Sequence, residues 1–288
     1  MLENFRPCGA FLDTYINAFV AGSGTPMLLL HGYPQNLYEW AEVAPILAGH
    51  HTVVCSDLRG YGDSGKPEVD GDNYSFHAMA KDQRDLMRSL GYEHFSVIGH
   101  DRGARVALAL AQDHPEAVTH LGLLDIVPTE EVFKQTDAAI AASYWHWYFL
   151  QKPSPYPEGL IAGNPAHYFD GFFASIGKMS AEETDNEQFA SYRKTWLDPD
   201  FIRATCEDYR TNGAAAQREP AFQAKRVDCP ALVAWGTEGV LPVHFDLKEL
   251  WDARLTDATY VPMPGGHYFI DQFPKETARI ILEFLQPG

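Results

Sequence analysis

The chain has 288 residues, 45% of them hydrophobic, so it can bury a large core. Because this length is near the size at which a single core stops growing, we expect one main domain with an insertion. Its formal charge of −17 argues against nucleic-acid and anionic-membrane surfaces, both of which select basic patches. No stretch is long and apolar enough to predict a membrane span. The four cysteines are widely spaced and indicate neither a zinc site nor disulfides, so we expect reduced thiols in a cytoplasm.

The first part of the chain alternates buried strands with helices. Short apolar runs predict the strands, and glycine-punctuated loops follow them. A pattern like a capping box, formed by Asn36 and Glu39, predicts the start of one helix. In chain order we expect a strand at 27–30, a loop at His31-Gly32-Tyr33-Pro34, a helix from Asn36, a strand at 52–56, a loop at 57–64 and an amphipathic helix at 75–90.

The stretch from 95 to 105 carries the clearest signal. An apolar run ends in Gly-His-Asp-Arg-Gly and turns directly into an alanine-rich helix that Pro115 brings to an end. This pattern is typical of a nucleophile elbow, in which the nucleophile lies at the tip of a strand-to-helix turn, here with Asp101 where serine is usual. Gly99 and Gly103 fit such a turn because the two backbones approach too closely for a Cβ. We therefore predict that Asp101 is a nucleophile.

The rest of the chain contains further strands, at 121–126, 231–235 and 259–261, and a helix at 275–285. Strands and helices that alternate in this way predict an α/β fold with a mostly parallel sheet covered by helices on both faces. Residues 128–221 break the alternation, since they are rich in aromatics and prolines and lack strand-like runs. We expect this segment to be a helical cap, inserted into a core made of residues 1–127 and 222–288.

Two polar residues are candidates to work with Asp101. Ligands of open α/β sheets bind at the carboxyl ends of the strands. Asp125 lies near the end of one predicted strand, and His267 lies in a glycine-rich loop after the last one. Their chain order is nucleophile, acid, histidine. An acid at this place would hold the imidazole in one tautomer and stabilise its protonated form. Glu238 is the competing acid, and we prefer Asp125 because it lies nearer the end of its strand.

With these motifs the chain resembles the α/β-hydrolases that use an aspartate nucleophile, and within that branch it is most similar to the fluoroacetate dehalogenases. The resemblance extends over nearly the whole chain. The His-Gly and elbow motifs specify only the fold and the branch, whereas two arginines after the nucleophile and a His-Trp and Tyr in the cap are more selective. The matching segments are 31–34, 57–62, 99–105, 124–126, His146-Trp147, 206–210 and Gly266-His267.

The two arginines also make physical sense without the family. Arg102 and Arg105 stand three positions apart in the first turn of a predicted helix, so both guanidinium groups can leave the same side. Two guanidinium groups near one helix N-terminus form a site for a carboxylate. The alternative is that Arg105 pairs with an acidic neighbour, Asp57 or Asp85.

The cap run 143–149 has the composition of a helix face packed on a core. His146, the Trp147 indole N–H and the Tyr209 hydroxyl are nevertheless hydrogen-bond donors, and the resemblance implies that a His, a Trp and a Tyr at these places bind the leaving halide. Fluoride is a poor leaving group because its charge is concentrated. Donors aimed at it would stabilise the charge that develops in the transition state.

The resemblance implies a hydrolytic dehalogenase acting on short 2-haloacids such as fluoroacetate and chloroacetate. Asp101 would form an ester with the substrate, and water activated by His267 would hydrolyse it. The backbone N–H groups of Tyr33 and Arg102 would form the oxyanion hole. This mechanism requires no metal or organic cofactor. The expected binding partner is a small haloacid, and we expect neither nucleic acid nor a membrane to bind. The family suggests a homodimer.

Two rival functions stay open on the sequence alone. An epoxide hydrolase would use the same Asp, His and acid, and would need two cap tyrosines, Tyr209 with either Tyr144 or Tyr148, to protonate the epoxide oxygen. The arginine pair speaks against it, because an uncharged epoxide requires no such cations. A non-catalytic ligand-binding module is the second alternative, since a fold by itself does not specify catalysis.

Overall fold

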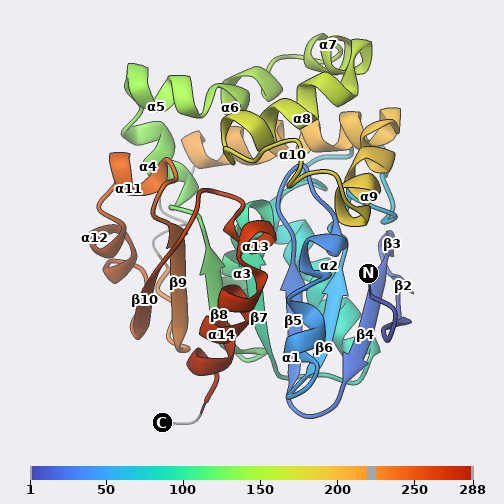
Figure 1. Cartoon of the computed structure of the whole chain (residues 1–288), viewed down its shortest axis with the longest axis vertical. Coiled ribbons are helices and arrows are strands. Elements are labelled where there is room, and N and C mark those ends of the chain that lie inside the picture. The colour runs from blue at the N-terminus through green and yellow to red at the C-terminus, as the bar shows by residue number, and fades with distance from the viewer. Residues whose placement is uncertain (1, 219–224, 287–288) are drawn as a thin grey trace.

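The computed structural model describes residues 2–218 and 225–286, which are built around a mixed eight-stranded sheet (Figure 1). The six central and C-terminal strands run parallel, and two N-terminal strands add antiparallel to one edge. The predicted α/β class with a mostly parallel sheet is confirmed, but the antiparallel edge was not foreseen. The strand order is β1 (Arg6–Pro7), β4 (Ala18–Gly22), β6 (Thr52–Ser56), β5 (Pro26–Leu30), β7 (Phe95–His100), β8 (Val118–Leu124), β9 (Ala231–Gly236) and β10 (Ala258–Met263), while β2 (Ala10–Phe11) and β3 (Tyr15–Ile16) pair separately.

Both faces of the sheet are buried, as a parallel sheet requires. Successive residues of β5 point to opposite faces, so that Leu28 and Leu30 join one apolar cluster while Met27 and Leu29 join the other. Helices α2 (Phe76–Ser89) and α3 (Asp101–Asp113) cover the first face, and α1 (Ala44–Leu47) and α14 (Pro274–Phe284) cover the second (Figure 1).

The helix expected from Asn36, with Leu37, Trp40 and Val43 as its apolar positions, is interrupted after Trp40. Asn36 does act as an N-cap, because its side chain accepts a hydrogen bond from the Tyr38 N–H (3.1 Å), but only a 3₁₀ turn, η1 (Leu37–Trp40), follows before α1. The Glu39 side chain does not complete a capping box. It instead accepts a hydrogen bond from the Gly32 N–H (2.7 Å), so a tertiary contact takes the place of the local one.

Only helices lie between β8 and β9 in the described part of this segment, and in Figure 1 most of them form a layer above the carboxyl ends of the strands. The prolines of this segment predict helices in short pieces, whereas the last of them has 20 residues. The predicted boundary at 221/222 lies outside the described residues, and the division into core and cap stays a prediction. The helices are α4 (Thr129–Lys134), α5 (Ala138–Ser143), α6 (Trp145–Leu150), α7 (Tyr156–Gly163), α8 (Pro165–Ser175), α9 (Glu187–Trp196) and α10 (Pro199–Arg218).

Three short helices follow the later strands: α11 (Leu241–His244), α12 (Leu247–Asp252) and α13 (Phe269–Gln272). Within residues 2–218 and 225–286, no helix combines the length and the apolar character needed to cross a bilayer.

Candidate active site

The turn between β7 and α3 has the geometry of the predicted elbow. Asp101 is the first residue of α3, and its φ of 45° lies in the left-handed region. A Cβ on Gly99 would come within 2.4 Å of the Gly103 carbonyl carbon, and one on Gly103 within 2.4 Å of the Leu30 carbonyl oxygen. Both glycines are therefore needed for the close approach of strand and helix that raises Asp101 above the sheet edge.

Asp125 and His267 lie beside Asp101. The His267 Nε2 is 3.9 Å from Asp101 Oδ2, and its Nδ1 is 2.6 Å from Asp125 Oδ2. Asp125 directly follows β8 with a φ of 51°, and its other oxygen accepts a hydrogen bond from the Gly236 N–H (2.8 Å). The Glu238 side chain is exposed, so the acid in contact with the imidazole is Asp125.

The charges around this pair favour an ionised Asp101. Burial would raise the pKa of Asp101, but His267, His100 and the two arginines outweigh it and hold the pKa at about 2. For His267, burial alone would lower the pKa, whereas the hydrogen bond and charge of Asp125, together with the charge of Asp101, raise it above the usual value. The site therefore holds a nucleophile that stays ionised and a base that titrates above its ordinary range.

The two arginines are placed differently from each other. The Arg105 guanidinium donates to the Val127 carbonyl (2.9 Å) and to Thr129 Oγ1 (2.7 Å), and its buried Nε has no hydrogen-bond partner among the described residues. Arg102 forms an ion pair with buried Asp208 and is not among the residues that line the cavity over Asp101. Arg105 does line that cavity.

The acidic partners considered for Arg105 from the sequence are occupied elsewhere. Asp85 binds Lys81 and Arg84. Asp57 accepts hydrogen bonds from the Asn17 side chain and from the Leu37 N–H, each at 2.8 Å. Hence Arg105 donates its observed hydrogen bonds to neutral oxygens, and its charge acts on the cavity that it shares with Asp101.

The three cap donors meet at the same cavity, which has a volume of about 20 Å³. His146, Trp147 and Tyr209 all line it, with the Tyr209 ring 5.9 Å from that of His146 and 6.1 Å from that of Trp147. Burial lowers the pKa of His146 to about 3, so the ring is neutral and offers one N–H. This volume is close to the smallest that can hold one water molecule, so the cavity suits only a very small organic ligand.

Comparison with known proteins identifies the family. Residues 25–274 match the family model of the alpha/beta hydrolase fold. The chain belongs to the α/β-hydrolase fold family. It is 49% identical to a fluoroacetate dehalogenase of Burkholderia sp over 95% of this chain and 91% of that protein, which confirms the resemblance drawn from the motifs.

Two further relatives mark the breadth of this family. The hydrolase is 32% identical to a soluble epoxide hydrolase of Corynebacterium sp. (strain C12), with 96% of each chain covered. A solved structure of a candidate alpha/beta hydrolase from Nostoc sp PCC 7120 superposes with a TM-score of 0.96, at 41% identity and full coverage of both chains.

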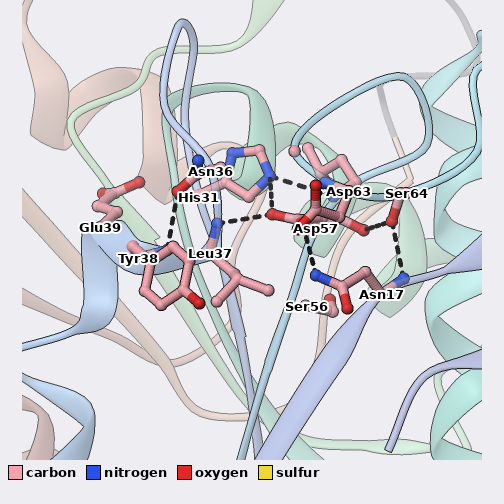
Figure 2. A network of polar contacts seen from close by, with 12 residues as sticks. Asn17, His31, Asn36, Leu37, Tyr38, Glu39, Ser56, Asp57, Asp63 and Ser64 are labelled. Carbon is pink, nitrogen blue, oxygen red and sulfur yellow. Dashed lines mark hydrogen bonds and ion pairs between the residues drawn. The ribbon is translucent and has the colours of Figure 1, made fainter. Parts of the chain in front are cut away.

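A buried polar network fixes the loops of the hydrolase that flank Asp101 (Figure 2). The His31 Nδ1–H donates to the Gly32 carbonyl (2.8 Å), while its Nε2 accepts a hydrogen bond from the Leu58 N–H (3.1 Å). Asp57 lies at the centre of the network, and burial raises its pKa to about 6. The loop so held presents the Tyr33 N–H to Asp101 Oδ1 at 3.0 Å, the place expected of an oxyanion-hole donor.

Reasoning from the sequence missed a second buried acid and histidine behind the elbow of the hydrolase. His100 Nδ1 is 2.7 Å from Glu39 Oε1, both side chains are fully buried, and His100 Nε2 donates to the His267 carbonyl (2.9 Å). These contacts attach the histidine loop to the strand that carries the nucleophile. The available signal was a histidine inside an otherwise apolar strand, because a buried imidazole needs a partner.

Proposed function

We propose that this α/β-hydrolase is a hydrolytic dehalogenase that converts fluoroacetate and chloroacetate to glycolate and halide. The observation that carries the proposal is one small cavity lined by the Asp101 carboxylate, the Arg105 guanidinium and three hydrogen-bond donors. An anion is needed to match the arginine, and a leaving group of concentrated charge is needed to match the donors. The identity to a fluoroacetate dehalogenase supports the same substrate class.

In the first step, Arg105 holds the substrate carboxylate and Asp101 attacks the carbon that bears the halogen; the guanidinium of Arg102, which the sequence predicted to share the carboxylate, is bound to Asp208 instead. Because Tyr33 donates to Oδ1, Oδ2 is the free oxygen that forms the new C–O bond. The C–X bond breaks with its electron pair on the halide, which leaves toward His146, Trp147 and Tyr209. The product is an ester of Asp101.

In the second step, His267 takes a proton from water, and the resulting hydroxide attacks Cγ of Asp101. The Tyr33 N–H, with the Arg102 N–H, stabilises the oxyanion. The bond between Cγ and the glycolate oxygen then breaks, and that oxygen receives the proton from His267. Asp101 is left as a carboxylic acid with the second proton of the water, and loss of this proton to solvent restores its carboxylate. Asp125 keeps the ring in place and stabilises its protonated form through the 2.6 Å contact.

The pH dependence of turnover should report His267. The ring must be neutral to accept a proton, and its raised pKa places the loss of activity toward acid at a higher pH than an ordinary histidine would. In the ester, Asp101 is uncharged and its attraction for the protonated ring is gone, while that of Asp125 remains. Because His267 acts only in hydrolysis of the ester, the acid limb should appear in kcat, whereas kcat/KM, which ends at the irreversible loss of halide, should not depend on its protonation. Initial rates of halide release from about pH 5 to 9 check this; a kcat that stays level down to the acid end would contradict the role of His267.

A halide-release assay tests the function itself. We expect fluoride from fluoroacetate and chloride from chloroacetate, with little hydrolysis of styrene oxide. Turnover of styrene oxide without halide release would overturn the proposal in favour of an epoxide hydrolase. If the folded protein converted none of these three compounds, the non-catalytic ligand-binding module would be the remaining alternative.

One observation favours the epoxide hydrolase as a second candidate. Tyr144 and Tyr209 both line the cavity, whereas the Tyr148 hydroxyl is taken by Thr136 at 2.6 Å. The pair of tyrosines that an epoxide requires is therefore Tyr144 with Tyr209. The cation in the same cavity, Arg105, is unfavourable for an uncharged substrate, and for this reason we rank the dehalogenase first.

The proposal includes a cytoplasmic homodimer. The four cysteines are unpaired thiols, in keeping with a reducing compartment. The homodimer is an expectation from the family alone.

A further inference from the structure

Arg102 and Asp208 form an ion pair that connects the cap to the first turn of α3. The Arg102 Nε–H donates to Asp208 Oδ2 (2.9 Å), and its Nη2 donates to Oδ1 and to the Asp208 carbonyl (3.2 Å). Both side chains are buried. Since α10 carries Asp208, this bidentate contact sets where the cap helix lies relative to the nucleophile elbow.

Hydrogen bonds from other side chains hold Asp208 in place. It accepts hydrogen bonds from the Tyr61 hydroxyl (2.6 Å) and from Asn212 Nδ2 (2.8 Å). Asn212 in turn accepts one from the Phe76 N–H (2.9 Å), at the start of α2. A carboxylate with this many donors has little freedom to move, so the guanidinium it holds is fixed as well.

The next residue along α10 is the halide-donor candidate Tyr209, and it packs on the same guanidinium. The Arg102 Cζ lies over two rings, 4.2 Å from the centre of that of Tyr209 and 4.5 Å from the centre of that of Phe76. Asp208 therefore binds the N–H groups of the guanidinium, while its cationic carbon lies over the Tyr209 ring. The position of the Tyr209 ring over the cavity depends on where Asp208 holds Arg102.

We infer that Asp208 is a positioning residue for halide release: it fixes Arg102, and through the cation–π contact of Arg102 with Tyr209 it fixes the Tyr209 hydroxyl at the place where the leaving halide develops charge. It also neutralises Arg102, so that Arg105 supplies the charge that attracts the substrate carboxylate. This inference rests on the proposed function. Its consequence is that fluoride release depends on Asp208 more than chloride release does, because fluoride needs its donors most.

The test is Asp208→Asn, which keeps the shape of the side chain but removes the charge and one acceptor for the Arg102 fork. We expect kcat for fluoroacetate to fall by about tenfold to a hundredfold, as for a misplacement near 1 Å, and kcat for chloroacetate to fall by clearly less. Inhibition by acetate, which has no leaving group, should persist because Arg105 stays in place. Equal losses for both substrates, no loss, or loss of acetate inhibition would overturn the inference.

The chain offers a matched control in Asp82→Asn. Asp82 is a buried aspartate that holds the buried Arg59 by two hydrogen bonds of 2.8 Å, and neither residue lines the cavity. This variant should lose stability in the same way while its ratio of fluoroacetate to chloroacetate turnover stays that of the parent. If Asp208→Asn fails to fold, Tyr61→Phe removes one hydrogen bond to Asp208 and should shift the ratio in the same direction by less.

A double-mutant cycle tests whether Asp208 acts through Tyr209. In a Tyr209→Phe background, Asp208→Asn should no longer change the ratio of fluoroacetate to chloroacetate turnover; a full additional change would contradict the coupling. Chloride binding, followed by tryptophan fluorescence, separates this inference from the proposed function because it requires no turnover. Weaker chloride binding in Asp208→Asn but not in Asp82→Asn would support the positioning role even if the parent protein released no halide from any haloacetate, and unchanged binding would overturn it.

Discussion

Replacing His267 with asparagine is expected to stop the reaction at a covalent ester on Asp101. The change removes the Nε2 that lies 3.9 Å from Asp101 Oδ2, so water is no longer activated, whereas the attack on the substrate needs only the ionised carboxylate. Loss of a general base costs about 10² to 10⁴-fold, so the ester should form faster than it is hydrolysed. Intact-protein mass spectrometry after incubation with fluoroacetate should show one added carboxymethyl group, which peptide mapping should place on Asp101.

The control is the double variant with Asp101→Ala, which has no nucleophile and should gain no mass. In the single variant, the halide released should equal the amount of enzyme and then stop. A folded His267→Asn protein that binds acetate but never becomes modified would rule out the ester intermediate.

Arg105→Leu is expected to cause the second large loss. Arg105 is a cavity-lining cation whose observed hydrogen bonds go to neutral oxygens, and no carboxylate among the described residues forms an ion pair with it. Losing one member of a buried charge pair costs about 2–5 kcal/mol, which at roughly 1.4 kcal/mol per factor of ten lowers kcat/KM for haloacetates by about 30-fold to several thousandfold. Steady-state kinetics over a wide range of chloroacetate concentration measure this loss in kcat/KM.

Thr129→Val provides the matched comparison, because it removes a hydroxyl that Arg105 donates to at 2.7 Å while the guanidinium charge remains. It should raise KM far less than Arg105→Leu does. If Arg105→Leu left haloacetate turnover at the parental level, the arginine would have no part in binding the substrate carboxylate.

The elbow could be predicted from the sequence because its determinants are local. Gly99 and Gly103 lie within five residues of one another, and a Cβ on Gly99 would clash with Gly103 itself. The clash at Gly103 is with Leu30 of the neighbouring strand, but the spacing of the two glycines around Asp101 already marks the turn. The contact between Asp125 and His267 could also be predicted from the sequence, although the two residues are far apart in the chain, because parallel strands bring their carboxyl ends to one edge of the sheet.

The unequal roles of the two arginines could not be predicted in this way. Spacing along a helix indicates that Arg102 and Arg105 leave the same side, but it does not reveal Asp208, which comes from a cap helix 106 positions later. The contact between Glu39 and His100 escaped for the same reason. There the local pattern was misleading, because Glu39 looked like part of a capping box and is used instead by a distant strand.

Asp101 and Asp125 share a backbone conformation that L-residues seldom adopt, with φ angles of 45° and 51°. Residues held in such regions cost about 1–3 kcal/mol each, a sizeable part of the roughly 5–15 kcal/mol that keeps a domain folded. Glycine would relieve the strain at either position but would remove the carboxylate. Resistance to heat and catalytic turnover therefore compete at the same two residues, and attempts to raise the melting temperature should begin elsewhere in the chain.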